Sequence, residues 1–196
     1  MKKLALFDFD GTITTKDTML EIIKYHRGKL RFLLGFLWLS PVMVFYKAGI
    51  LSNWRAKEIT LKHFFGGMAE EQFRTLGEQF AREVIPPLVR ERAQKSIEEY
   101  KAAGDRVVLV TASSDYWVKP WADAMDIEIL ATRLSSEAGK ITGKIDGKNC
   151  HGPEKVNRVK AEIDLSQYEE IHAYGDTSGD KEMLAMADKS FYRHFE

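Results

Sequence analysis

The chain has 196 residues, in which 29 Lys and Arg balance 29 Asp and Glu. This length suits one domain with a smaller addition, and the balanced charge excludes a strongly basic protein that depends on nucleic acid as a partner. The single cysteine, Cys150, excludes an intramolecular disulfide and is expected to be structural. The N-terminal apolar run is too short for a secretion signal, so we expect a cytoplasmic protein.

Residues 3–9, KLALFDF, form a nearly continuous apolar run that contains Asp8 and is followed by Asp10. Such a run is typical of a strand in a parallel sheet that is covered on both faces. Because alternate residues of a strand point the same way, Asp8 and Asp10 are predicted to share one face while Phe9 enters the core.

The next seventy residues lack a strand pattern and are predicted to be helical. Within them, the segment 32–46, FLLGFLWLSPVMVFY, is the most apolar part of the chain and carries no charge. It is shorter than the roughly 20 residues that cross a bilayer, and Pro41 interrupts it. We interpret it as a buried helical pair; the alternative is a weak contact with a membrane surface or with a second copy of the chain.

From Pro86 onward, strand and helix patterns alternate. Pro86 and Pro87 are predicted to begin a helix that ends before Gly104. The later predicted elements are a strand at 106–113, a helix at 115–125, a strand at 127–131, a glycine-punctuated hairpin at 136–149, a helix from 153, a strand and helix within 170–188, and a last strand at 190–195.

This alternation predicts an α/β protein with a Rossmann-like, doubly wound parallel sheet and an inserted α-helical cap. We expect residues 1–14 and 86–196 to form the core domain and residues 15–85 to form the cap.

Several polar residues fall at the carboxyl ends of the predicted strands or at the helices that follow, where doubly wound sheets bind ligands. They are Asp8, Asp10, Thr111, Lys155, Asp176 and Asp180. Carboxylates that converge without His or Cys favour Mg²⁺, which is commonly completed by a substrate phosphate. Lys155 and Thr111 could hold phosphoryl oxygens. Ser113 and Ser114 are interpreted as caps of the next helix, and His151 as part of a solvated loop.

With these residues in place, the sequence resembles the haloacid dehalogenase superfamily of phosphohydrolases. DFDGT at 8–12 matches the first motif of the superfamily, Thr111 the second, Lys155 the third, and GDTSGD at 175–180 the fourth. The four motifs occur in order, each in its predicted structural setting.

The resemblance implies specific roles for these residues. Asp8 would be the nucleophile that forms an aspartyl phosphate, and Asp10 the general acid and base. Mg²⁺ would be held by Asp8, Asp10 through its backbone carbonyl, Asp176 and Asp180, the last as a ligand or an anchor. The phosphoryl group would contact Gly11, Thr111, Ala112 and Lys155.

The position of the insert implies the first cap type of the superfamily, similar to phosphoserine phosphatases of subfamily IB. Asp17 stands where those enzymes carry a substrate-binding Glu, and Arg55 does not align clearly with their cap Arg. The expected substrate is therefore a small phosphorylated metabolite, phosphoserine-like or a lipid phosphate. The alternatives are a phosphotransferase or phosphomutase with the same chemistry, or a non-catalytic module that binds a phospho-ligand or docks through its apolar insert.

Overall fold

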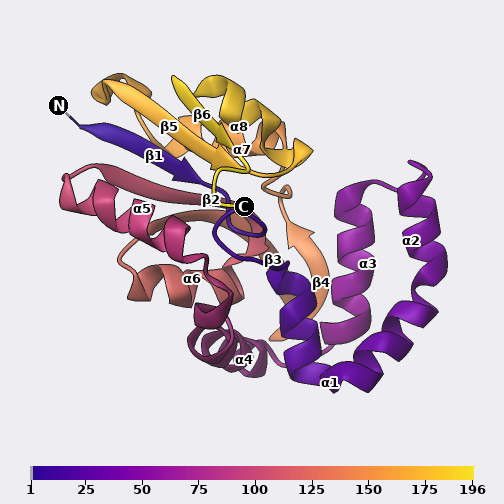
Figure 1. The fold of residues 1–196 in the computed structure, drawn as a ribbon. Helices are drawn as coiled ribbons and strands as arrows, with labels where there is room; N and C mark the ends of the chain where they lie inside the picture. Colours follow the sequence, from indigo (N-terminus) through magenta and orange to yellow (C-terminus); the bar gives the residue numbers. More distant parts are fainter. Residues whose placement is uncertain (1) are drawn as a thin grey trace.

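The computed structural model describes residues 2–196, and its central element is a six-stranded sheet (Figure 1). The strand order is β4-β3-β2-β1-β5-β6. All neighbouring strands are parallel except β3 and β4, which form an antiparallel hairpin. The bounds are β1 Lys3–Phe7, β2 Arg106–Ser114, β3 Glu128–Glu137, β4 Lys140–Asp146, β5 Glu170–Gly175 and β6 Lys189–Tyr192. The predicted α/β fold class is confirmed.

Helices connect the strands and cover both faces of the sheet. The α-helices are α1 Thr18–Trp38, α2 Ser40–Lys47, α3 Asn53–Phe65, α4 Glu70–Glu83, α5 Glu91–Ala102, α6 Asp115–Ala124, α7 Pro153–Glu162 and α8 Lys181–Met186. Short 3₁₀ helices occupy Pro86–Leu88, Leu165–Gln167 and Ser178–Asp180.

The alternation of side chains along β1 divides the core into two layers. Ala5 and Phe7 pack into a cluster that also contains residues of α5, α6 and the helical insert. Leu4 and Leu6 point to the opposite face, against residues of α7 and α8. Because both faces of β1 are buried, its sequence is continuously apolar rather than alternating.

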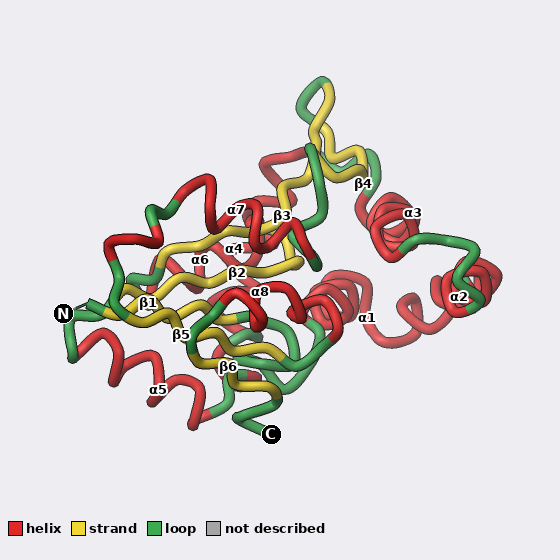
Figure 2. The backbone as a smooth tube through the Cα atoms, turned by 90° about the horizontal axis from the view of Figure 1, so that it is seen from above, coloured by secondary structure: helices red, strands yellow, loops and turns green. Residues whose placement is uncertain are grey.

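The four helices α1–α4 lie between β1 and β2 in the chain. Helices α1, α2 and α3 lie to one side of the sheet, whereas α4 packs against α6 (Figure 2). The segments that enter and leave this helical insert run side by side: Thr14 pairs with Val89, and the amide of Thr15 donates to the carbonyl of Leu88 at 2.8 Å. Helix α3 also packs against β4. The division into a core of residues 1–14 and 86–196 and a cap of residues 15–85 stays a prediction.

The structure corrects the interpretation of residues 32–46 as a buried pair. The second half of α1 and helix α2 each bury only part of their surface, and Leu37 and Trp38 are 70% and 76% exposed. Pro41 does interrupt the segment as expected, since α2 begins next to it. No single helix of residues 2–196 is long and apolar enough to cross a membrane; α1 and α2 reach that length and apolarity only together, with a bend of 58°.

Smaller differences concern the ends of elements. Pro86 and Pro87 begin a 3₁₀ turn, not the following helix, which starts at Glu91. The strand predicted at 127–131 continues to Glu137 because it pairs with β4 in the predicted hairpin. The last strand ends at Tyr192, and Arg193 adopts a positive φ of 52°.

Candidate active site

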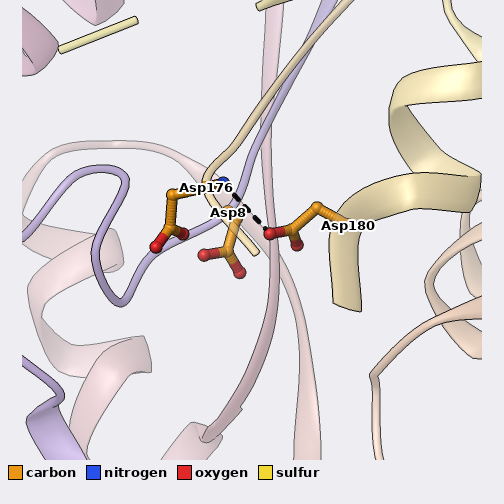
Figure 3. A group of neighbouring side chains, drawn as sticks. All are labelled: Asp8, Asp176 and Asp180. Carbon is orange, nitrogen blue, oxygen red and sulfur yellow. Dashed lines mark hydrogen bonds between the residues drawn. The ribbon is translucent and has the colours of Figure 1, made fainter. Parts of the chain in front are cut away.

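Three carboxylates from distant parts of the chain meet at the carboxyl ends of β1 and β5 (Figure 3). Asp8 directly follows β1, Asp176 directly follows β5, and Asp180 ends the 3₁₀ turn before α8. One oxygen from each lies within 4.8 Å of the others, and all three residues are buried. The Asp180 side chain accepts from the backbone amides of Asp176 and Thr177, at 3.2 and 3.0 Å, which fixes the turn.

Lys155 is the cation at the centre of this cluster. It lies near the start of α7 and is 1% exposed. Its Nζ donates to Asp8 Oδ1 at 2.5 Å, to Asp180 Oδ1 at 2.7 Å and to the carbonyl of Val110 at 2.7 Å. All three ammonium protons are therefore used, and the side chain joins β1, β2 and the 3₁₀ turn.

Asp10 is held apart from the carboxylate cluster by hydroxyl and amide donors. Its Oδ1 accepts from the amide and the hydroxyl of Thr18, both at 2.6 Å, and its Oδ2 accepts from Ser113. Thr18 in turn accepts from the indole of Trp117 at 3.1 Å. Phe9 is fully buried between the two aspartates in the chain, as predicted, and packs on Trp121. This network fixes the Asp10 carboxyl in one orientation.

Burial controls the protonation of these groups. Burial raises the pKa of Asp8 to about 8, because its effect is larger than the opposite effect of Lys155. Burial also raises the pKa of Asp10 to about 6, and the charge of Asp17 adds to this increase. Burial alone would lower the pKa of Lys155, but Asp8 and Asp180 raise it overall. Burial raises the pKa of Asp180, but Lys155 and backbone amides lower it overall.

These residues fit a divalent cation. Three buried carboxylates face one ammonium, so the fully ionised cluster has an excess of negative charge that its surroundings do not neutralise. Burial raises the pKa of Asp8, so in the absence of a metal the cluster favours a protonated carboxyl group. The three side-chain ligand candidates are carboxylates and the ligand expected from Asp10 is a backbone carbonyl, so all candidate ligand atoms are oxygens, which favours Mg²⁺. Asp8 and Asp176 are the candidate ligands, while Asp180, held by Lys155 and two amides, fits better as their anchor.

Gly11 and Thr12 position Asp176 from the loop that follows Asp10. The Thr12 hydroxyl donates to Asp176 Oδ1 at 3.0 Å. Gly11 has a φ of 87°, and a Cβ at this position would overlap the Asp176 carboxylate. The glycine of the DFDGT motif therefore lets the first loop approach the acid that follows β5. Its expected contact with a phosphoryl group stays a prediction.

A cavity of about 560 Å³ opens beside Asp8, Asp10 and Lys155, between the sheet and the helical insert. Ala112 and Ser113 of β2 line it, as does Asp17. The Asp17 side chain also caps α1 by accepting from the amide of Leu20 at 3.0 Å. The insert contributes an apolar wall, which includes Met19, Leu20, Phe36, Met43 and Tyr46.

Two sequence-based interpretations around this cavity are corrected, the first only in part. Ser114 caps α6 as expected, but Ser113 does not, because its hydroxyl donates to Asp10. His151 is not in a solvated loop: it lines the cavity, packs against Gly179, and burial lowers its pKa. Thr111 is 1% exposed and its hydroxyl accepts from the amide of Ser113 at 3.0 Å, so it orders the turn beside the cavity.

Lys57 of α3 is a cavity residue that the sequence did not suggest. Its Nζ donates to the carbonyl of Ala112 and lies 3.4 Å from Asn149 Oδ1, so a cationic side chain of the insert reaches the sheet. Burial lowers its pKa, against the opposite effect of Asp10 and Asp17. Lys57 belongs to no sequence motif, and a lysine on a helix is most often exposed to solvent, so the sequence gives no reason to place it at the cavity.

The fold and the site define an α/β protein with a helical insert and a buried acidic cluster at the carboxyl ends of its strands. A family model described as haloacid dehalogenase-like hydrolase matches residues 5–185, and the chain belongs to this family. Among curated proteins, the chain is 38% identical to Protein CicA of Caulobacter vibrioides, over 98% of this chain and 86% of that protein. It is 28% identical to a probable phosphatase of Mycobacterium tuberculosis, over 92% of this chain and 64% of that protein.

Solved structures show the same fold. A Bordetella pertussis protein of unknown function has a TM-score of 0.81 with 26% identity, covering 97% of this chain and 89% of that one. A substrate-bound phosphoserine phosphatase has a TM-score of 0.67 with 23% identity, covering 98% of this chain and 86% of that one, and shows that the fold is phosphoserine phosphatase-like. The predicted resemblance is thus confirmed.

Proposed function

We propose that this protein is a Mg²⁺-dependent phosphomonoesterase that acts through an aspartyl phosphate on Asp8. The observation that carries the proposal is the convergence of Asp8, Asp176 and Asp180 around Lys155, with Asp10 held beside the same cavity. Membership of the haloacid dehalogenase-like hydrolases supports it.

In the first step, the Asp8 carboxylate attacks phosphorus and the bond between phosphorus and the leaving oxygen breaks. Within residues 2–196, the hydrogen bonds to the Asp8 side chain go to Oδ1, so Oδ2 is the candidate nucleophile. Lys155 holds Asp8 in place and offsets the charge of the incoming phosphoryl group. Bound Mg²⁺ would supply charge neutralisation for the phosphoryl oxygens, held by Asp8 and Asp176.

Asp10 fits the acid and base role in both steps. Its pKa of about 6 lies near neutrality, where a carboxyl group can both give and accept a proton. In the first step it would protonate the leaving alcohol. In the second it would accept a proton from the water that attacks phosphorus, which releases inorganic phosphate and restores the Asp8 carboxylate. The hydrogen bonds from Thr18 and Ser113 keep its oxygens near the cavity.

The cavity wall suggests the class of leaving group. Phe36 and Met43 offer apolar contact, and Lys57 offers a positive charge. A leaving group with an apolar portion and an anionic group fits this lining, as in a lipid phosphate; phosphoserine supplies the anionic group but little apolar surface.

The test is turnover of a panel of phosphomonoesters with Mg²⁺, which includes phosphoserine, short-chain lipid phosphates and p-nitrophenyl phosphate. Asp8→Asn should abolish phosphate release and covalent labelling while the protein stays folded. Asp10→Asn should lower kcat by about 10²- to 10⁴-fold on alkyl phosphates and less on p-nitrophenyl phosphate, whose leaving group needs little protonation. Asp123→Asn, on the exposed face of α6, is the matched control.

Three results would contradict the proposal: phosphate trapped on a residue other than Asp8, undiminished hydrolysis in excess EDTA, or no turnover on any member of the panel. Transfer of the phosphoryl group to added alcohols in preference to water would identify a phosphotransferase instead.

A further inference from the structure

The second half of α1 and helix α2 expose an unusual apolar surface. We call it the apolar tip and define it by Leu30, Leu33, Leu37, Trp38, Val44 and Phe45, all more than half exposed. Figure 2 shows these two helices extending away from the sheet. Large apolar side chains that are exposed in this number on two consecutive helices mark an interaction surface on a folded protein.

The apolar tip follows the helical period. Leu30, Leu33 and Leu37 share one face of α1, with spacings of three and four residues. The opposite face of the same half-helix is also apolar and is already used: Phe64 packs on Gly35 and against Phe36. This part of α1 is therefore apolar on both sides, but only one side has a partner within residues 2–196.

The charged residues of the segment that carries the tip, residues 22–57, are all positive. Residues 22–57 contain no Asp or Glu, although the whole chain carries 29 of them. The Lys and Arg residues in the same span are Lys24, Arg27, Lys29, Arg31, Lys47, Arg55 and Lys57. Lys29, Arg31, Lys47 and Arg55 are exposed. In a chain of zero net charge, this local excess sits directly beside the exposed apolar residues.

We propose that the apolar tip docks on the surface of an anionic lipid bilayer, with its leucine and tryptophan side chains in the interface and Lys29, Arg31 and Lys47 among the lipid headgroups. Amphipathic helices that combine large apolar residues with Lys and Arg bind such surfaces, and Trp prefers the depth of the headgroups. Attraction to anionic lipid adds to apolar burial.

A second copy of the chain fits this surface less well. A two-fold contact would place two identical tips face to face, and Lys29, Arg31 and Lys47 of each copy would approach one another without an acid in either tip. An anionic bilayer supplies the missing negative charge. If α1 and α2 dock on a bilayer, the cavity lies next to the docked helices, because Phe36, Met43 and Tyr46 of these helices line it.

The experiment measures binding of the full chain to vesicles of phosphatidylcholine alone and of phosphatidylcholine with phosphatidylglycerol, by co-sedimentation without substrate. We expect binding to the anionic vesicles only, weakened by high salt. The double variant Leu37→Ser, Trp38→Ser should lose about ten-fold or more in affinity, because two large side chains no longer enter the interface. Tyr192→Ser, an exposed aromatic of β6, is the matched control.

A charge variant tests the second half of the argument. Lys29→Glu with Arg31→Glu should weaken binding to anionic vesicles, whereas Lys95→Glu on the exposed side of α5 should not. Equal binding to neutral and anionic vesicles, or unchanged binding of the Leu37→Ser, Trp38→Ser variant, would overturn the proposal. A concentration-dependent dimer that the same variant disrupts, without vesicle binding, would assign the surface to a second copy. Because no turnover is measured, failure here leaves the proposed phosphatase activity untouched.

Discussion

The Nζ of Lys155 lies 2.5 Å from Oδ1 of Asp8, and both residues are buried. The lysine comes from α7 and the aspartate follows β1, so the pair joins parts of the chain that are 147 residues apart. The same ammonium binds Asp180, which connects the pair to the turn after β5. Lys155 therefore carries both the structure of the site and its charge balance.

Replacing Lys155 tests its contribution to stability and its contribution to catalysis in two separate measurements. Lys155→Met leaves buried carboxylates without their cation, which should cost about 3 kcal/mol of unfolding free energy at pH 7.5 without metal. Loss of a positive group beside the phosphoryl site should lower kcat by at least about 10²-fold. Lys160→Met, on the exposed side of the same helix, should change neither value. Urea unfolding and phosphate release measure both, and a Lys155→Met protein with normal turnover would remove the lysine from the mechanism.

The pH dependence of stability follows from the raised pKa values. Asp8 and Asp10 have folded-state pKa values of about 8 and 6, against about 4 for an unfolded Asp. Between these values the unfolded chain binds fewer protons than the folded one, so unfolding becomes easier as the pH rises. The contribution of the two protonated carboxyl groups to the free energy of unfolding is complete below about pH 4. The contribution of Asp10 is lost as the pH rises through about 6, and that of Asp8 as it rises through about 8.

Metal-free protein should therefore lose at least about 1 kcal/mol of unfolding free energy between pH 5 and 7.5, and Mg²⁺ should restore it at the higher pH. Asp8→Asn should flatten this dependence, whereas Asp123→Asn should preserve it. The measurement is urea unfolding at both pH values with and without Mg²⁺. A rise in stability with pH in the metal-free protein would show that the cluster is ionised without a cation.

The sequence predicted the sheet and the acidic cluster because both depend on local patterns. Strands β1 and β2 contain continuous apolar runs at residues 4–7 and 107–110, and each acid of the cluster is next to a strand or a helix start. The sequence could not reveal Lys57 or His151, since their places at the cavity depend on how α3 and the loop before α7 pack. The prediction that residues 32–46 are buried within the protein is wrong. An apolar sequence indicates that a surface is covered, but it does not show whether the cover is the same chain or a partner.

Gly11 offers a test of the metal site that separates backbone strain from crowding. Gly11→Ala would place a methyl group on the Asp176 carboxylate, so it should weaken Mg²⁺ binding by more than about ten-fold as Asp176 moves away. Gly67 has a similar φ of 82° but open space around it, so Gly67→Ala carries the strain without the overlap. Titration calorimetry with Mg²⁺ compares the two. Equal loss of affinity in both variants would attribute the effect to strain alone.

Lys57 tests whether the helical insert selects the substrate. Its Nζ reaches the carbonyl of Ala112 from α3, beside Asp10 and Ser113. Lys57→Met keeps the length of the side chain and removes its charge, so KM for a phosphomonoester with an anionic leaving group should rise about ten-fold, the loss expected for one charged hydrogen bond.

The same variant should leave KM for p-nitrophenyl phosphate nearly unchanged, because that leaving group carries no anionic group for the lysine to hold. Arg55→Met, whose guanidinium stacks on Trp54 outside the cavity, is the matched control. Steady-state kinetics on both substrates give the result. An equal change in KM for the two substrates would mean that Lys57 holds the insert against the sheet rather than the leaving group, and a fall in kcat alone would place it among the groups that act on the reacting phosphoryl.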